Sequence, residues 1–222
     1  MPTATEWEIL ALSLKVALWG LAASLPVAIA VAFVLARKQF PGKTLFDAVV
    51  HLPLVLPPVV VGFALLVLFG TQGPIGKLLE PLGVVLIFKW TGAALAAAIM
   101  GFPLMVRAIR LAIEAVDTRL ESAARTLGAS RTRVFFTVTL PLAASGVITG
   151  ALLAFARALG EFGATITFVS NIPGETRTLP LAIYTFTQVP GGDAQALRLS
   201  LFSVALSLLA LAVSEWMVRR RA

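Results

Sequence analysis

The segment ESAARTLGASRTRVFFTVTLPL, residues 121–142, stands between two long apolar runs and is itself polar and basic. Around its start, the sequence predicts a short helix over 118–127. Asp117 or Thr118 can cap this helix, because short polar side chains accept hydrogen bonds from its first free backbone amides. Gly128 follows, and a glycine there permits the left-handed turn that closes many helices. A polar helix enclosed by apolar runs predicts a segment that leaves the membrane and meets a partner.

Small residues mark the expected docking surface. Ala123 and Ala124 give the first helix a flat face, so that the backbone or a large side chain of a partner approaches closely. A second helical stretch is expected from Ser130 toward Pro141, where the next apolar run begins. We therefore interpret the segment as a docking element at a membrane surface.

The composition places the chain in a membrane. Hydrophobic residues make up 59% of the 222 residues and charged residues only 13%, with a mean hydropathy of +0.94. Soluble domains usually have about 45–50% apolar and about 25% charged residues. The net charge of +7 comes from basic residues at the ends of apolar runs, which favours topology signals over nucleic-acid binding. The absence of cysteine excludes disulfides, thiolate metal sites and cysteine nucleophiles.

Five apolar runs are long enough to cross a bilayer, since a spanning helix needs about 20 residues. We expect an all-α integral membrane protein with a single domain over 1–222, because an isolated strand cannot satisfy its backbone in lipid. A sixth crossing near 71–90 is the alternative to an external loop with a short surface helix there. The predicted spans are 9–36, 48–70, 91–113, 138–160 and 197–218, with a cytoplasmic loop at about 114–137.

Lysine and arginine counts set the orientation. With five spans, the basic connections fall on one side of the membrane, which the positive-inside rule makes the cytoplasm. The N-terminus is then outside and the C-terminus inside. The residues that carry this prediction are Arg37, Lys38, Lys43, Arg119, Arg125, Arg131, Arg133, Arg219, Arg220 and Arg221.

Two regions depart from simple spans. Pro53, Pro57 and Pro58 lie in the span at 48–70 and favour a structural kink over a moving hinge. Residues 161–196 alternate semi-apolar pieces with prolines and glycines, which predicts a broken segment. Non-helical backbone at membrane depth is tolerated where it is buried in protein or lines a water-filled cavity. This segment is therefore a candidate pathway lining, with an ordinary external loop as the alternative.

Ionisable residues in the apolar runs have structural interpretations. Arg157 and Glu161 are four residues apart, which suits an ion pair within a helix, and a neutralised pair is a poor anion site. Lys15 can extend its amine to the outer interface. His51 is the only histidine and has no second His or Cys to complete a metal site, so neither a metal site nor a catalytic residue is predicted.

The docking segment resembles the cytoplasmic loop of permease subunits of binding-protein-dependent ABC importers. That loop has the form Glu-Ala-Ala, three residues, Gly, nine residues, Ile, one residue, Leu-Pro. The matching positions, with the spacing intact, are Ala123, Ala124, Gly128, Leu140 and Pro141. Ser122 stands where the motif has its first Glu, with Glu121 one residue earlier, and Val138 replaces Ile.

Three further segments resemble the molybdate permeases of this family. They are 51–62 (HLPLVLPPVVVG), 102–110 (FPLMVRAIR) and 159–180 (LGEFGATITFVSNIPGETRTLP). Sulfate permeases are similar in outline but usually have a Tyr after the Glu of Gly-Glu-Phe and diverge after Asn-Ile-Pro. The resemblance favours molybdate, with tungstate and sulfate or thiosulfate as the alternative substrates.

The resemblance implies an ABC type I importer permease fold, a homodimeric pore in membrane lipid, and two cytoplasmic ATPase subunits. It also implies an external molybdate-binding protein that delivers the oxyanion. The chain has no GxxxxGK[ST] phosphate loop, so ATP and Mg²⁺ are expected on the ATPase and no cofactor on this chain. No nucleic acid is expected as a partner.

Residue roles follow from the same resemblance. The docking helix would be a coupling helix that rests in a groove of an ATPase, through Glu121, Ala123, Ala124, Gly128, Leu140 and Pro141. In the broken segment, neutral hydroxyl and amide groups can bond a passing oxyanion without trapping it, as conduction requires. These candidate pathway residues are Thr165, Thr167, Ser170 and Asn171.

A passive channel and a membrane enzyme are the alternatives from other classes. A channel would need no ATPase, so co-purification with a nucleotide-binding subunit separates it from an importer. The single His, the absence of Cys and the lack of paired carboxylates within one span argue against an intramembrane hydrolase.

Overall fold

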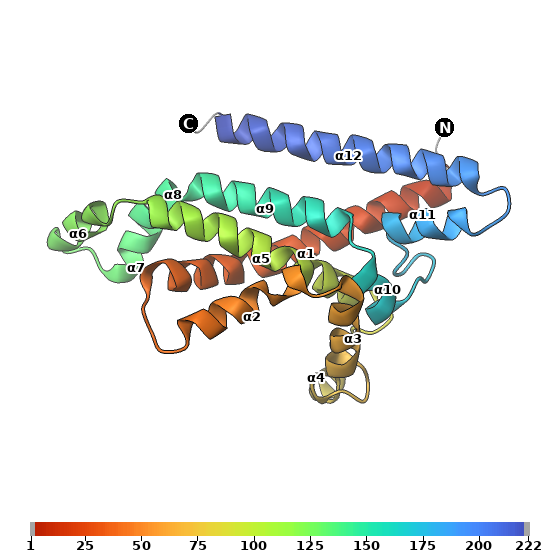
Figure 1. Cartoon of the computed structure of the whole chain (residues 1–222), viewed down its shortest axis with the longest axis horizontal. Helices are drawn as coiled ribbons and strands as arrows, with labels where there is room; N and C mark the ends of the chain where they lie inside the picture. The colour runs from red at the N-terminus through yellow and green to blue at the C-terminus, as the bar shows by residue number, and fades with distance from the viewer. Residues whose placement is uncertain (1–2, 220–222) are drawn as a thin grey trace.

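The computed structural model describes residues 3–219, and in that range the chain forms helices and turns without a strand. The all-α prediction is confirmed. Figure 1 shows an elongated bundle from which α3 and α4 project as an arm. Arg220 and Arg221, which contribute to the predicted orientation, lie outside the described residues.

Three helices are long and apolar enough to cross a membrane by themselves. They are α1 (Ala4–Arg37), α5 (Trp90–Ala115) and α12 (Asp193–Arg219). α1 begins before the predicted span at 9–36 because Thr3 and Glu6 form a capping box. The Thr3 amide donates to the Glu6 carboxylate at 2.7 Å, and the Glu6 amide donates to the Thr3 hydroxyl.

The predicted span at 48–70 is broken rather than kinked. It consists of α2 (Lys43–Val55) and α3 (Pro58–Phe69), which are bent by 114° relative to each other. At the break, Leu56 and Pro57 have extended ψ angles of 142° and 134°. Pro57 and the proline after it lack amide hydrogens, and each disfavours a helical conformation in the residue before it. Two consecutive prolines therefore end one helix and send the next out of the bundle.

The predicted span at 138–160 also starts with a bend. After α7 (Arg131–Val134), the chain forms a π-helical segment, Phe135–Thr139, and the short helix α8 (Leu140–Leu142). α9 (Ala144–Leu159) then continues at 70° to the preceding residues. The proline in α8 has no amide hydrogen to donate to a continuous helical ladder. The expected helical stretch from Ser130 toward Pro141 is confirmed, with a π-helical segment inside it, and the bend follows at Ala143.

With each bent pair taken as one crossing, the structure has up to five candidate spans, the number predicted. Before α5 begins at Trp90, residues 71–89 contain only the short helix α4 (Pro74–Leu79) and a 3-10 turn, Glu80–Leu82, as helical elements. Neither is long enough for a sixth crossing. Residues 161–196 contain α10 (Gly163–Val169), α11 (Leu179–Thr187) and the start of α12, separated by non-helical stretches, so the predicted broken segment is confirmed.

Glycines bring α1, α5 and α9 into close contact. A Cβ added at Gly20 of α1 would lie 2.7 Å from a carbonyl oxygen of α5, and one added at Gly150 of α9 would lie 2.9 Å from another. Gly146, Gly150 and Ala154 recur every four residues along α9, a pattern of small residues typical of closely packed membrane helices. The close packing of α1, α5 and α9 therefore depends on glycines, which have no side chain, at these contacts.

Gly150→Leu is expected to destabilise this contact. Its Cβ alone would meet the Met105 carbonyl oxygen at 2.9 Å, so α9 must move away from α5. Overpacking typically costs about 1–3 kcal/mol, and a rigid backbone neighbour places this change at the upper end. The measurement is the thermal unfolding midpoint in detergent. Ala156→Leu, at an exposed position of the same helix, is the control, and an equal loss in both variants would contradict the packing explanation.

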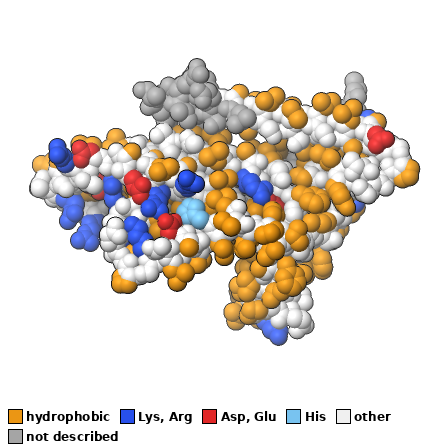
Figure 2. Space-filling view, in the orientation of Figure 1, with side chains coloured by type: hydrophobic (Ala, Val, Ile, Leu, Met, Phe, Trp, Pro, Cys, Tyr) orange, Lys and Arg blue, Asp and Glu red, His pale blue; other side chains and the backbone are white. Residues whose placement is uncertain are grey.

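The two ends of the bundle carry different features. Figure 1 places α6 (Thr118–Thr126) and α7 at one end, and α10, α11 and the start of α1 at the other. In Figure 2, charged side chains gather toward the α6 end, whereas hydrophobic side chains cover the arm. The predicted docking helix and the broken segment therefore lie at opposite ends.

Candidate functional site

α6 is capped at both ends within the chain. At its start, the Asp117 carboxylate accepts a hydrogen bond from the Arg119 amide at 2.8 Å. At its end, the Ala129 amide donates to the Ala124 carbonyl at 3.1 Å, and the Gly128 amide donates to a carbonyl of the last turn at 3.0 Å. This pair of bonds is a Schellman motif, which favours glycine in the left-handed position, and φ of Gly128 is +87°. The predicted helix and its glycine turn are confirmed.

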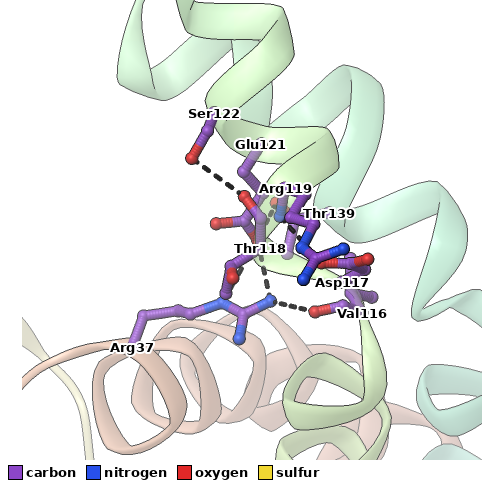
Figure 3. Close-up of polar contacts among 8 residues, drawn as sticks. All are labelled: Arg37, Val116, Asp117, Thr118, Arg119, Glu121, Ser122 and Thr139. Atoms are coloured by element: carbon purple, nitrogen blue, oxygen red, sulfur yellow. Dashed lines mark hydrogen bonds and ion pairs between the residues drawn. The ribbon is translucent and has the colours of Figure 1, made fainter.

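The Glu121 carboxylate fastens α6 to the bundle (Figure 3). Its Oε1 accepts hydrogen bonds from Arg37 Nε at 3.1 Å, from Arg37 Nη2 at 2.9 Å and from the Thr139 hydroxyl at 3.0 Å. Arg37 Nη2 also donates to the Val116 carbonyl at 2.9 Å. The Arg37 and Glu121 side chains are only 14% and 19% exposed, so water screens their ion pair little. We call this set, Arg37, Val116, Glu121 and Thr139, the Glu121 clamp.

The clamp joins elements that are distant in the sequence. Arg37 ends α1, Val116 follows α5, Glu121 belongs to α6, and Thr139 ends the π-helical segment. A carboxylate that accepts three hydrogen bonds, two of them from a guanidinium, is held firmly. Glu121 therefore positions α6 within the chain, and its predicted part in ATPase coupling stays a prediction.

The outer face of α6 is apolar and exposed. Leu120 is 50% exposed and Leu127 is 89% exposed, with exposed Ala123 between them. Residues at this i, i+3, i+7 spacing share one side of a helix. Ala124 is half-buried. We call Leu120, Ala123 and Leu127 the docking stripe; its two leucines are absent from the residues predicted above, although their helical spacing is readable in the sequence.

The other predicted coupling residues have separate places. Gly128 lies at the exposed end of α6, and a Cβ added there would meet nothing within 4 Å. Leu140 and Pro141 belong to α8, in the bend before α9, and not to α6. Ser122, at the acidic position of the motif, donates its hydroxyl to the Thr118 carbonyl at 3.0 Å. Ala123 and Gly128 thus lie on one exposed surface, whereas Leu140 and Pro141 lie in the bend before α9.

The four predicted pathway residues lie in α10 and in the turn after it. Thr165 is buried, and the Thr167 hydroxyl donates to a carbonyl of its own helix at 2.9 Å. Asn171 donates to a threonine hydroxyl of α11 at 2.7 Å and accepts from an arginine of the turn at 2.9 Å. Ser170 is exposed and has φ of +64°. Thr167 and Asn171 thus use polar groups within the chain, and the pathway role of the four stays a prediction.

The expected pair between Arg157 and Glu161 is present. Arg157 Nη1 lies 2.6 Å from Glu161 Oε2, and the Glu161 side chain is 1% exposed. Glu161 Oε1 also accepts from the Ala164 amide at 2.8 Å, so the pair connects α9 with the first turn of α10. Lys15, predicted to extend toward the outer interface, places its ammonium 3.7 Å from the centre of the Trp90 ring. The cationic side chains of Arg157 and Lys15 therefore both have partners within the bundle.

α3 and α10 touch through two glycines. A Cβ added at Gly62 of α3 would lie 2.5 Å from the Ala164 carbonyl oxygen, and one added at Gly163 of α10 would lie 2.8 Å from Pro58 Cβ. These contacts join the arm to the broken segment as one unit. A glycine inside the apolar helix of the arm is the signal in the sequence that points to such a contact.

Comparison with known proteins agrees with this geometry. Residues 24–222 match the family model described as "binding-protein-dependent transport system inner membrane component". The chain belongs to this family. Members of the family are permease subunits of transporters, so the chain is a transport component of the inner membrane, built of apolar helices.

Several relatives in the binding-protein-dependent transport family are similar over nearly the whole chain. The molybdenum transport system permease protein ModB of Escherichia coli is 61% identical over 218 residues, which cover 98% of this chain and 95% of that protein. ModB of Haemophilus influenzae is 59% identical, covering 94% and 92%. The sulfate transport system permease protein CysW of Synechococcus elongatus is 43% identical over 155 residues, covering 70% and 54%.

Solved structures of ABC transporters share the fold. A bacterial ABC transporter involved in the import of alginate has a TM-score of 0.78 and 18% identity, covering 99% of this chain and 80% of that chain. The MetNI methionine ABC transporter, in an inward-facing conformation, has a TM-score of 0.70 and 18% identity, covering 98% and 94%. The chain therefore has the ABC type I importer permease fold that the resemblance implied.

Proposed function

We propose that this chain is the permease subunit through which an ATP-driven ABC importer carries molybdate across the cytoplasmic membrane. The observation that carries the proposal is the 61% identity to Escherichia coli ModB over 98% of the chain. The sulfate permease relative is less similar and matches a smaller part of the chain. Molybdate is therefore the favoured substrate, with sulfate, thiosulfate and tungstate as alternatives.

Uptake in cells tests this proposal. The chain is produced with the ATPase and binding protein of a molybdate importer in a strain without its own permease, and uptake of radiolabelled molybdate is measured. Uptake should require the ATPase and should resist excess sulfate. Preferential sulfate uptake would transfer the function to the sulfate alternative, and uptake without the ATPase would indicate a passive channel.

In the proposed assembly, two copies of the chain form the pore and each α6 binds one ATPase subunit. ATP and Mg²⁺ are bound by the ATPases. The N-terminus lies outside and the end of α12 in the cytoplasm, because basic residues around α6 mark its end of the bundle as cytoplasmic. An external binding protein delivers the oxyanion at the opposite end, near α10 and α11. The basic residues that support this orientation are Arg119, Arg125, Arg131 and Arg133.

In this proposal, movement of the ATPases reaches the pathway through a chain of contacts that begins at the docking stripe and continues through contacts within the permease. The docking stripe meets the ATPase, and the Glu121 clamp ties α6 to the ends of α1 and α5. α5 packs on α9 through glycines, and the Arg157–Glu161 pair connects α9 to α10. α10 in turn carries the arm through Gly62. Rotation of α6 is thus transmitted to α3 and α10 at the other end.

Gly62→Val is expected to reduce molybdate uptake while ATPase binding persists. Its Cβ would lie 2.5 Å from the Ala164 carbonyl oxygen, so α3 must separate from α10. Such overpacking costs about 1–3 kcal/mol, enough to lower uptake by about tenfold if α3 and α10 move as one unit. Uptake and ATPase co-purification are measured together. Ala64→Val adds the same side chain on the exposed side of α3 and should transport normally; normal uptake by Gly62→Val would contradict the transmission.

A further inference from the structure

An open pocket of about 490 Å³, lined by both charged and apolar side chains, lies between α2 and α5. Charged side chains are costly within membrane-spanning helices, where they pair with one another or face a water-filled cavity and mark functional sites. Figure 2 shows the single histidine among acidic and basic side chains on this face of the bundle. The polar residues that line the cavity, called the α2–α5 pocket, are Thr44, Asp47, His51, Arg107, Arg110 and Glu114.

Two carboxylates hold Arg110 in place. Its Nη1 lies 2.8 Å from Asp47 Oδ2, and its Nε lies 2.8 Å from Glu114 Oε1. His51 Nδ1 lies 2.9 Å from the Asp47 carbonyl oxygen and 3.0 Å from Asp47 Oδ1, which fixes Asp47 in turn. A guanidinium has five N–H donors. Among the described residues, the Nη2 group of Arg110 has no hydrogen-bond partner, so it can donate to a ligand in the pocket.

Arg107 is a second cation of the pocket and has a different environment. Among the side chains that the structure describes, no carboxylate lies within ion-pair distance of Arg107. It precedes Arg110 by three residues, so both side chains lie on one face of α5. Arg107 is exposed, and its guanidinium is available to a ligand.

We infer that the α2–α5 pocket is a transient site for a tetrahedral oxyanion. Arg107 donates paired hydrogen bonds to two oxygens, as guanidinium groups do with oxyanions. The Arg110 Nη2 group and the Thr44 hydroxyl supply further donors. Asp47 and Glu114 both pair with Arg110, so Arg107 supplies the positive charge that is not engaged in an ion pair, and a dianion binds weakly and leaves again, as conduction requires.

The position of the pocket gives the site its place in transport. It lies toward the end of α5 that precedes α6, which is the cytoplasmic end in the proposed orientation. The inference rests on the proposed function for the direction of transport, in which the oxyanion binds in the pocket before it is released into the cytoplasm. The phosphate of an anionic lipid has the same tetrahedral chemistry, so the test separates the two sources.

Protection of Arg107 from phenylglyoxal tests the site. The permease–ATPase complex in phosphatidylcholine nanodiscs is modified in molybdate, sulfate or chloride at equal ionic strength, and peptides are analysed by mass spectrometry. Molybdate is expected to slow modification of Arg107 by about tenfold, as one charge-assisted hydrogen-bonded contact allows, and sulfate should protect as well. Arg198, on α12 at the other end of the bundle, is the internal control and should be unaffected.

Each result of this experiment has a defined meaning. Protection by phosphatidylglycerol nanodiscs but not by molybdate supports the oxyanion site and assigns it to a lipid headgroup. Absence of protection by molybdate, sulfate and phosphatidylglycerol overturns the site. Because protection requires no transport, a wild-type chain that imports no molybdate would overturn the proposed function and leave the protection result standing.

Uptake by Arg107 variants gives a second readout. Arg107→Gln is expected to lower molybdate uptake by about tenfold with normal ATPase co-purification, since one charge-assisted contact is lost. Arg107→Lys should restore part of it, because an ammonium keeps the charge without the paired donors. Lys38→Gln removes a positive charge at the same end and should transport normally. Wild-type uptake by Arg107→Gln would overturn a role of the site in transport.

Discussion

Glu121→Ala is expected to lower molybdate uptake by at least about tenfold while the ATPase subunits remain bound. The change removes three hydrogen bonds and leaves the Arg37 guanidinium, 14% exposed, without its carboxylate. Removing one partner of a fully buried ion pair costs roughly 3–5 kcal/mol, and this partly exposed pair is expected to cost less. α6 then moves without moving α1 and α5. The measurement is ATP hydrolysed per molybdate transported in reconstituted vesicles, which should rise.

A double-mutant cycle isolates the clamp. Arg37→Ala should produce the same uncoupling, and the double variant should lose less than the sum of the single variants, since no charge is left unpaired. Glu8→Ala removes an exposed carboxylate from the far end of α1 and should transport normally. Loss of ATPase binding by Glu121→Ala, with the docking stripe intact, would mean that the carboxylate contacts the ATPase directly and would contradict the clamp.

Gly128→Asp is expected to weaken ATPase binding by at least about tenfold. Gly128 has φ of +87°, a left-handed conformation that Asp tolerates better than most L-residues, so backbone strain contributes little to this effect. The variant places a negative charge next to the exposed Leu127 of the docking stripe, where an apolar partner surface must then desolvate it. The measurement is the affinity of the purified permease for the isolated ATPase subunits.

Gly42→Asp is the matched control for that variant. Gly42 has φ of +83°, and a Cβ added there would also meet nothing within 4 Å. It precedes α2 and lies outside α6, so the change introduces the same backbone strain and the same charge away from the docking stripe. ATPase binding should stay normal. Equal loss in both variants would trace the effect to backbone strain and refute the docking role of Gly128.

Local features of the coupling segment could be predicted from the sequence. The N-cap at Asp117, the helix after it and the left-handed turn at Gly128 depend on residues within one or two helical turns. The pair between Arg157 and Glu161 has the same local origin. Fixed spacing around Gly128 also carried the family resemblance, which the match over residues 24–222 confirms.

Contacts between distant segments could not be predicted in this way. Arg37 is 84 residues from Glu121, and Thr139 is 18 residues away, so no helical period connects them. The sequence interpretation of Glu121 as an ATPase contact therefore had no information about the guanidinium that turns it inward. The large bend between α2 and α3 could not be predicted either. Whether the second proline, Pro58, breaks a membrane helix depends on whether neighbouring helices restore the lost hydrogen bonds.

Hydrophobicity, charge asymmetry and motif spacing by themselves determined an all-α membrane chain with a coupling segment, because these are properties of neighbouring residues. Tertiary structure alone decided which face of α6 is free, how the Glu121 clamp closes and how Gly62 joins the arm to α10. It also decided that Arg107 and Arg110 share a pocket with Asp47. The physical reason is that burial and hydrogen-bond partners are set by the approach of helices far apart in the chain, which packing of small residues permits.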